Sequence, residues 1–129
     1  MEPHPTEGEL AILRALWARR EPSTVRDVHA ALSRTKDTAY TTVLKMMTIM
    51  ADKGLVKRDE SARSHLYSAT HPAPQVQSAL LRDLMQRAFD GSAVQLVQSA
   101  LDANAASAED LDQIARMIAD ARAQRGRTE

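Results

Sequence analysis

Apolar residues near the start of the chain recur every three or four positions, which is the spacing of an α-helix. Leu10, Leu13, Leu16 and Trp17 would share one face of this helix. Directly before that face, residues 6–9 have the S/T-x-x-E form of a capping box, which marks a helix start. The pattern therefore predicts a first helix that runs from this box to about residue 20.

A second helix is predicted after a short break that contains Pro22. Val25, Val28 and Leu32 fall on one face of it, and either residue 23 or residue 24 can supply the hydroxyl group that caps its start. A polar connection over residues 34–37 follows.

The third predicted helix begins at residue 38 or just before it and ends at Lys53, where Gly54 suits the left-handed conformation that often follows a helix. By helical geometry its two sides differ in character. One side is mostly apolar and is made of Tyr40, Val43, Met47 and Met50. The other side carries hydroxyl groups and a lysine, and is made of Thr38, Thr41, Thr42, Lys45, Thr48, Ile49 and Asp52. The apolar side is expected in the core and the hydroxyl-bearing side at the surface.

Residues 55–59 and 64–69 alternate apolar and polar side chains, which indicates two short β-strands joined by a turn at residues 60–63. Lys57, Arg58 and Arg63 give this hairpin positive charge. A helix that can enter a major groove, followed by a basic hairpin, is the plan of a winged helix-turn-helix. The sequence thus predicts a mainly α-helical fold with a small antiparallel β-hairpin.

Residues 70–74 contain two prolines and mark the predicted boundary between a winged-helix DNA-binding domain, residues 1–71, and a helical dimerisation domain, residues 72–129. Gly91 and Ser92 separate the first two helices of the second domain, and Ser107 caps the last. Its apolar stripes supply the candidate dimerisation residues, which are Val76, Leu80, Leu81, Leu84, Met85, Phe89, Val94, Val97, Leu101, Leu111, Ile114 and Ile118.

The second predicted domain is too small to be stable around a core of its own. Its stripe over residues 75–90 is also broad for the few partners that the same chain offers. Because two-fold dimers are the commonest oligomers, we expect a homodimer whose C-terminal helices interlock. The alternative is a monomer in which these helices fold back on the N-terminal domain.

The composition narrows the class of protein. Apolar residues make up 43% of the chain and aromatic residues only 3%, so the core must be built from aliphatic side chains and methionine. The net charge is zero, and by itself the charge pattern is that of an ordinary solvated surface. There is no cysteine, no signal-peptide pattern and no run near the ~18 apolar residues of a membrane span. We expect a cytoplasmic protein without direct membrane binding.

No residue pattern suggests catalysis, a metal or a cofactor. The four histidines, His4, His29, His65 and His71, lack the spacing of metal ligands, and His29 is expected on the solvent side of the second helix. Four glycines in all cannot build a phosphate-binding loop. We therefore expect no enzyme, and no catalytic, metal or cofactor site.

Several motifs in a fixed order carry a family resemblance. They are Thr6-x-x-Glu9 with Leu13, Leu16 and Trp17, then Thr24-Val25-Arg26-Asp27-Val28, Ala39-Tyr40-Thr41-Thr42-Val43, Lys53-Gly54-Leu55-Val56, Arg63 with Tyr67-Ser68, and Phe89-Asp90-Gly91-Ser92. In this order the chain resembles, over about residues 6–120, the penicillinase-repressor family of BlaI/MecI type, which are bacterial winged-helix repressors.

The resemblance implies a homodimeric repressor that binds double-stranded DNA at pseudo-palindromic operators. Family members commonly control genes for β-lactamases or penicillin-binding proteins, a role in antibiotic resistance. They are commonly released when a membrane sensor-protease, or another protease, leads to cleavage of the dimerisation domain.

Some positions depart from the family pattern. The family usually has Trp where this chain has Thr38, often Thr where it has Lys45, and Arg where it has Ile49. The bond that is cut in some members aligns near residues 99–100, where this chain has Ser-Ala. The operator sequence and the cleavage site therefore cannot be transferred. The absence of cysteine excludes the copper-responsive branch.

The predicted roles follow from side-chain chemistry. Threonine and lysine on the third helix can bind base edges or phosphates, the hairpin cations can grip phosphates or the minor groove, and the start of the second helix can meet a phosphate. Each position could instead be an ordinary solvated side chain. The predicted DNA-binding residues are Thr24, Arg26, Thr38, Thr41, Thr42, Lys45, Lys57, Arg58 and Arg63.

Two other functions remain open from the sequence. Winged helices also bind proteins, so the chain could be a protein-interaction module. It could also be a regulator that senses a small ligand in an apolar pocket, although the few aromatic residues and the short C-terminal arm argue against a roomy one.

Overall fold

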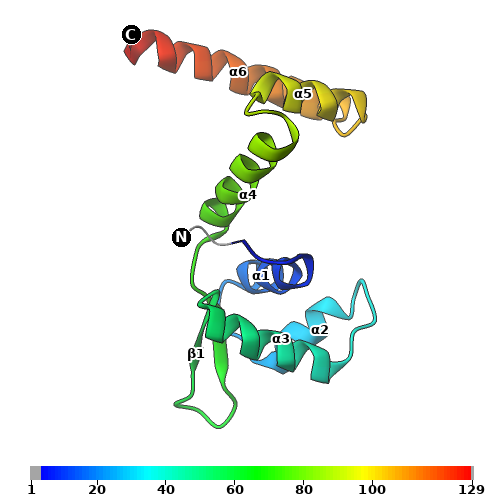
Figure 1. Ribbon diagram of the computed structural model, residues 1–129, viewed down its shortest axis with the longest axis vertical. Helices are drawn as coiled ribbons and strands as arrows, with labels where there is room; N and C mark the ends of the chain where they lie inside the picture. Colours follow the sequence, from blue (N-terminus) through cyan, green and yellow to red (C-terminus); the bar gives the residue numbers. More distant parts are fainter. Residues whose placement is uncertain (1–3, 129) are drawn as a thin grey trace. The chain divides into compact units, whose positions relative to one another are not determined.

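The computed structural model describes residues 4–128 and contains helices and one antiparallel two-stranded sheet (Figure 1). In chain order the elements are α1 (Glu7–Arg19), α2 (Val25–Leu32), α3 (Tyr40–Lys53), β1 (Val56–Asp59), β2 (Leu66–Ala69), α4 (Ala73–Ala88), α5 (Ala93–Asp102) and α6 (Ala108–Thr128). The predicted fold class, mainly α-helical with a small β-hairpin, is confirmed. The chain divides into two compact units between Arg82 and Asp83.

The core of the first unit lies where α1, α2 and α3 pack together and meet the hairpin (Figure 1). Its side chains are almost all aliphatic or methionine, as the scarcity of aromatic residues requires, and Tyr67 of β2 is the aromatic exception at 2% exposed. The buried members are Ile12, Leu13, Leu16, Val25, Val28, Val43, Met47, Met50, Leu55, Val56 and Tyr67. Burying these side chains is the main source of stability for the unit.

Capping boxes start the first two helices. In α1 the Thr6 hydroxyl accepts from the Glu9 backbone N–H at 3.2 Å, and the Glu9 carboxylate accepts from the Thr6 N–H at 2.9 Å. In α2 Thr24 and Asp27 exchange the equivalent bonds at 3.1 and 3.0 Å. Each box satisfies backbone N–H groups that a helix start leaves unpaired, and the choice between residues 23 and 24 is settled for Thr24.

The start of α3 differs from the prediction. The helix begins at Tyr40 rather than at residue 38, and its N-cap is Ala39, which makes no side-chain capping bond. The Thr38 hydroxyl donates to the Lys36 carbonyl at 3.2 Å, so it does not cap the helix. At the other end Gly54 has the expected left-handed conformation, with φ of 83°.

The hairpin follows α3 directly. Its strands pair from Val56 with Ala69 to Asp59 with Leu66, and both are shorter than predicted. A third extended segment joins them, because Ser23 forms an isolated antiparallel bridge with Tyr67 through backbone bonds of 2.9 and 2.8 Å. The base of the hairpin is thus tied to the residue just before the N-cap of α2.

An ion pair between a buried carboxylate and a half-exposed lysine joins α1 to the end of α3. Lys53 Nζ donates to the two carboxylate oxygens of Glu9 at 2.9 and 2.8 Å, and Glu9 is only 5% exposed. Burial tends to raise the pKa of Glu9, but the hydrogen bonds from Lys53 and Thr6 outweigh it, so the pKa lies below the ordinary value. The pair therefore stabilises the ionised carboxylate.

The first turns of α4 belong to the first unit. Val76 and Ala79 are each 1% exposed, and the Trp17 indole N–H donates to the His71 carbonyl at 3.1 Å. Val76 was predicted at a dimer surface, but its own chain already covers it, because α4 begins at Ala73 and packs its first turns inward. Likewise, the compact units divide within α4, whereas the sequence placed the boundary before this helix.

The second unit contains the end of α4 with α5 and α6. Ser92 caps α5 by accepting from the Gln95 N–H at 3.1 Å, and Ser107 and Asp110 form a reciprocal cap at the start of α6. Within residues 83–127 no side chain is buried. Large apolar side chains are left in water, including Val94, which is 79% exposed.

Candidate nucleic-acid interface

The two sides of α3 divide as the sequence predicted, with one exception. Val43, Met47 and Met50 are fully buried. Thr41 and Lys45 lie on the opposite side and are exposed. A helix presents residues i and i+4 on one face, so these two side chains point outward together.

Tyr40 is the exception, since it was predicted in the core and is 42% exposed. It is the first residue of α3 and lies at the edge of the buried face. Leu44, one turn later, is 41% exposed and had no predicted role. Ile49 is 43% exposed, as its predicted place on the hydroxyl-bearing side requires. The outer surface of α3 is therefore more apolar than a solvated helix face usually is.

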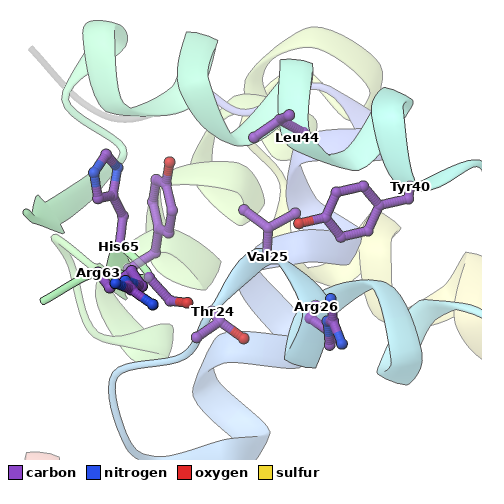
Figure 2. A pocket seen from close by; sticks show the side chains of 9 residues that line it. Thr24, Val25, Arg26, Tyr40, Leu44, Arg63 and His65 are labelled. Carbon is purple, nitrogen blue, oxygen red and sulfur yellow. The ribbon is translucent and has the colours of Figure 1, made fainter.

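A hollow of about 570 Å³ opens between α3, the start of α2 and the hairpin. Figure 2 shows that Tyr40 and Leu44 line it from α3, and that Arg26 and Arg63 reach it from the other two elements. Its full lining is Thr24, Val25, Arg26, Tyr40, Leu44, Arg63, Ser64, His65 and Tyr67. The hollow combines an apolar wall with two guanidinium groups, which suits an anionic ligand that also has apolar surface.

At the start of α2 the predicted residues are only partly available. The backbone N–H of Thr24 donates to Asp27, and its hydroxyl oxygen accepts from the Asp27 N–H, so the hydroxyl hydrogen and one lone pair of this oxygen remain for an outside partner. The hydrogen bond from the Thr24 backbone is the main cause that lowers the pKa of Asp27, which is thus ionised at neutral pH. Arg26, the second residue of α2, is exposed.

The hairpin cations fall into two classes. Arg58 Nε lies 2.9 Å from Glu60 Oε1, and a hydrogen bond with Tyr67 raises the pKa of Arg58 above its ordinary value. Its guanidinium group is thus held by its own hairpin. Lys57 and Arg63 are exposed, and Arg63 reaches the hollow. Arg63 is therefore the hairpin cation best placed to act together with Arg26.

Thr42 and Thr38 do not line this hollow. Both line a second hollow of about 630 Å³ on the opposite flank of α3, together with Ala11 of α1 and Met46. The residues predicted on the hydroxyl-bearing side are thus separated in the structure. Thr41 and Lys45 point outward from α3, whereas Thr42 and Thr38, which precedes the helix, line the second hollow.

His29 was expected on the solvent side of α2, but it is half-buried between α2 and α3. Its Nε2 lies 2.7 Å from the Thr38 carbonyl oxygen. Its ring meets Tyr40 edge to face, with ring centroids 5.6 Å apart. No sequence pattern marks this contact, because it joins two helices across the turn between them.

Residues 4–128 hold no group of three or more His, Cys, Asp and Glu side chains that could bind a metal ion. None of their helices is both long enough and apolar enough to cross a membrane.

The sequence missed six residues that line the first hollow: the buried Val25 and Tyr67, and the exposed Tyr40, Leu44, Ser64 and His65. Tyr40 and Leu44 are four positions apart, so helical spacing places them on the same face of α3. This shared face was missed because Tyr40 was predicted in the core. His65 carried no such signal, because its approach depends on how the hairpin folds back toward α2.

Known proteins share this chain's sequence pattern. The family model of the penicillinase repressors matches residues 5–120. The transcriptional regulator BlaI of two Mycobacterium tuberculosis strains, CDC 1551 and H37Rv, is 39% identical over 87 residues, which is 67% of this chain and 63% of each relative. The chain thus spans less than two thirds of the length of these relatives.

A solved structure shares the fold. The solution structure of monomeric Bacillus licheniformis BlaI in complex with the blaP half-operator superposes with a TM-score of 0.50 at 19% identity, and the match covers 58% of this chain and 90% of that one. At this identity the likeness supports the winged-helix fold alone. Because the family model covers nearly the whole sequence, and the motifs noted above lie within it, the chain belongs to the penicillinase repressor family.

Proposed function

We propose that this protein is a DNA-binding transcriptional repressor that inserts α3 into the major groove of its operator. The observation that carries the proposal is the division of α3, in which Val43, Met47 and Met50 are fully buried while Thr41 and Lys45 face outward. The family and the fold neighbour, which was solved with a half-operator, support the same role.

In this proposal each part of the surface has its own contact. Lys45 donates to guanine or phosphate, and Thr41 bonds a base edge or phosphate. Arg26 and Arg63 bind phosphates on either side of the groove, which positions the helix without reading sequence. Tyr40 and Leu44 pack on sugars or thymine methyl groups at the apolar wall of the hollow.

We further propose that the protein acts as a homodimer. No side chain of residues 83–127 is buried, and Leu84, Val97, Leu101 and Ile118 are each 43–53% exposed. Such a unit is not stable alone, and a second copy would cover it. DNA binding is assigned to residues 1–71 and dimerisation to residues 72–129, except that the inward-facing first turns of α4, with Val76, go with the first unit.

A two-fold dimer implies a pseudo-palindromic operator. The two α3 helices would enter half-sites one or two helical turns apart, at multiples of about 34–36 Å. The family resemblance makes genes for β-lactamases or penicillin-binding proteins the first candidates for regulation, and sequencing of the genomic fragments bound in cells tests this.

We also propose that the repressor is released from its operator when a sensor-protease, or another protease, causes cleavage of its dimerisation domain. The bond between Ser99 and Ala100 lies within α5, and both residues are exposed. A protease needs an extended substrate, so α5 would have to open locally before cleavage. Because the cut bond of other family members cannot be transferred to this chain, limited proteolysis must locate the site, and cleavage only outside residues 72–129 would contradict release through the dimerisation domain.

The central experiment is selection of bound duplexes from a random DNA pool, followed by titration of the recovered sequence at several salt concentrations. We expect an affinity that falls steeply with salt, because phosphate binding releases counterions. Binding that does not depend on salt, or that recovers no common sequence, would refute the proposal and favour a protein-interaction module. A symmetric recovered sequence would support the dimer.

The dimer itself is tested by sedimentation at micromolar concentration. We expect a dimer for the parent chain and a monomer for Val97→Glu, because a charge on an exposed apolar helix face blocks close packing. Arg87→Glu is the matched control, since Arg87 is highly exposed and only pairs with Asp83 on its own helix. A monomeric parent chain would refute the homodimer.

A further inference from the structure

Among the first three helices, α3 has the least well fixed start. Both α1 and α2 begin with reciprocal capping boxes, whereas α3 begins after Ala39, which offers no side-chain acceptor. Alanine is among the poorest N-cap residues, and without a cap the first turn tends to fray. Thr41 lies in that first turn, so its direction depends on whatever else holds the turn in place.

His29 is in the right position to hold it. Its Nε2 lies 2.7 Å from the carbonyl oxygen of Thr38, the residue just before the N-cap. A carbonyl can only accept, so Nε2 carries the hydrogen and donates it. The Ser33 hydroxyl is also near Nε2, but at 3.4 Å the contact is long.

The same imidazole ring supports the first residue of the helix. Its plane meets that of Tyr40 at 79°, with the centroids 5.6 Å apart, which is a favourable edge-to-face arrangement. His29 therefore contacts the chain on both sides of Ala39, through a hydrogen bond before it and a ring contact after it.

We propose that His29 is a positioning residue for DNA recognition: it anchors the residues on either side of the uncapped N-cap of α3 and so sets the direction of Thr41 and of Tyr40. His29 acts through α3 and need not touch DNA. This inference rests on the proposed DNA-binding function, but its first test does not require DNA.

The first test measures amide hydrogen exchange in the free protein. The Thr42 and Val43 N–H groups make the first hydrogen bonds of α3, to the Ala39 carbonyl at 3.1 and 3.2 Å. In His29→Ala, which has neither the donor nor the ring, these amides should exchange about three- to tenfold faster, the effect of losing one ordinary hydrogen bond. Exchange at the parent rate would overturn the proposal.

Two further variants separate the donor from the ring. His29→Gln keeps an N–H donor at the reach of Nε2 and should restore slow exchange, whereas His29→Phe keeps only the ring and should not. Ser33→Ala is the control, because its contact with His29 is long, and it should leave exchange unchanged. Equal exchange in the Gln and Phe variants would contradict the assigned hydrogen bond.

The second test measures DNA affinity on the duplex recovered by selection and on a random duplex. In His29→Phe we expect about a three- to tenfold loss on the selected duplex, with little change on the random duplex or in the salt dependence. A purely structural role would lower the free energy of unfolding but leave the selected affinity of the folded protein unchanged, and that result would overturn the proposal. If the parent chain binds no duplex, the repressor function fails, while the exchange data still decide whether His29 fixes the start of α3.

Discussion

Replacing Lys53 with methionine removes the cation that pairs with the buried Glu9 carboxylate between α3 and α1, and it keeps most of the side-chain volume. The Glu9 carboxylate would lose two hydrogen bonds, of 2.9 and 2.8 Å, but would keep the one from the Thr6 N–H. Hydrogen bonds to a charged group contribute about 1.5–3 kcal/mol. The Lys53 side chain is 45% exposed, so screening by water favours the lower end, and we expect a loss of about 2 kcal/mol at pH 7.

The loss should depend on pH in a defined direction. The pKa of Glu9 is lowered in the folded protein from an ordinary value of 4.5, so its contribution is present above that pH and is lost as the pH falls through the folded pKa. In Lys53→Met only the hydrogen bonds from Thr6 still counteract the effect of burial, which raises the pKa of Glu9, so this pKa should be higher than in the parent. The difference in stability between parent and variant should therefore shrink as the pH falls below about 4.5.

Urea denaturation followed by the fluorescence of Trp17, the single tryptophan, measures these free energies. Protein concentration must be held fixed, because the stability of a dimer depends on it. Glu60→Gln is the control, since Glu60 pairs with Arg58 at the surface and its loss should cost less than about 1 kcal/mol. An unfolding free energy of Lys53→Met equal to that of the parent at pH 7 would refute the reasoning.

Three further predictions concern the core, a turn and the interface. Met47→Ala should lower the free energy of unfolding by about 2–5 kcal/mol in urea titrations, because Met47 is fully buried, and a loss within error would contradict its place in the core. Gly54→Ala should cost about 1 kcal/mol through backbone strain at φ of 83°, since an added Cβ meets nothing within 4 Å, and a stabilised variant would speak against this. Lys45→Ala should weaken binding to the selected duplex by about 1–3 kcal/mol, whereas Arg63→Ala should weaken all duplexes similarly and flatten the salt dependence, and equal losses across sequences for both would contradict the division of roles.

The sequence predicted those parts of the fold that are determined by local chemistry. The caps of α1 and α2 and the glycine after α3 have side chains or conformations with one strong local preference, and the structure agrees there. The start of α3 was misplaced because Ala39, the residue before it, gives no local signal that a helix begins there. There the deciding contact comes from His29, on another helix.

The surface of α3 was predicted only in part, for a similar reason. Periodicity separates the buried Val43 from the exposed Lys45, but a residue at the edge, such as Tyr40, goes wherever its neighbours leave room. Val76 was predicted at a dimer surface but is buried by its own chain. An apolar stripe indicates that other residues cover it, but not whether they belong to the same chain or to a second copy. These details are set by tertiary packing, which a pattern of single residues does not contain.

The bridge between Ser23 and Tyr67 has a mechanical consequence for any duplex that lies across the hollow. Two backbone hydrogen bonds tie β2 to the head of α2, which limits how far the backbone of the hairpin can move away from Arg26 to follow a groove of unusual width. The DNA would have to adjust instead, at a cost that depends on how easily its own base steps bend or narrow. Base pairs that no side chain touches would then still influence how tightly a site is held.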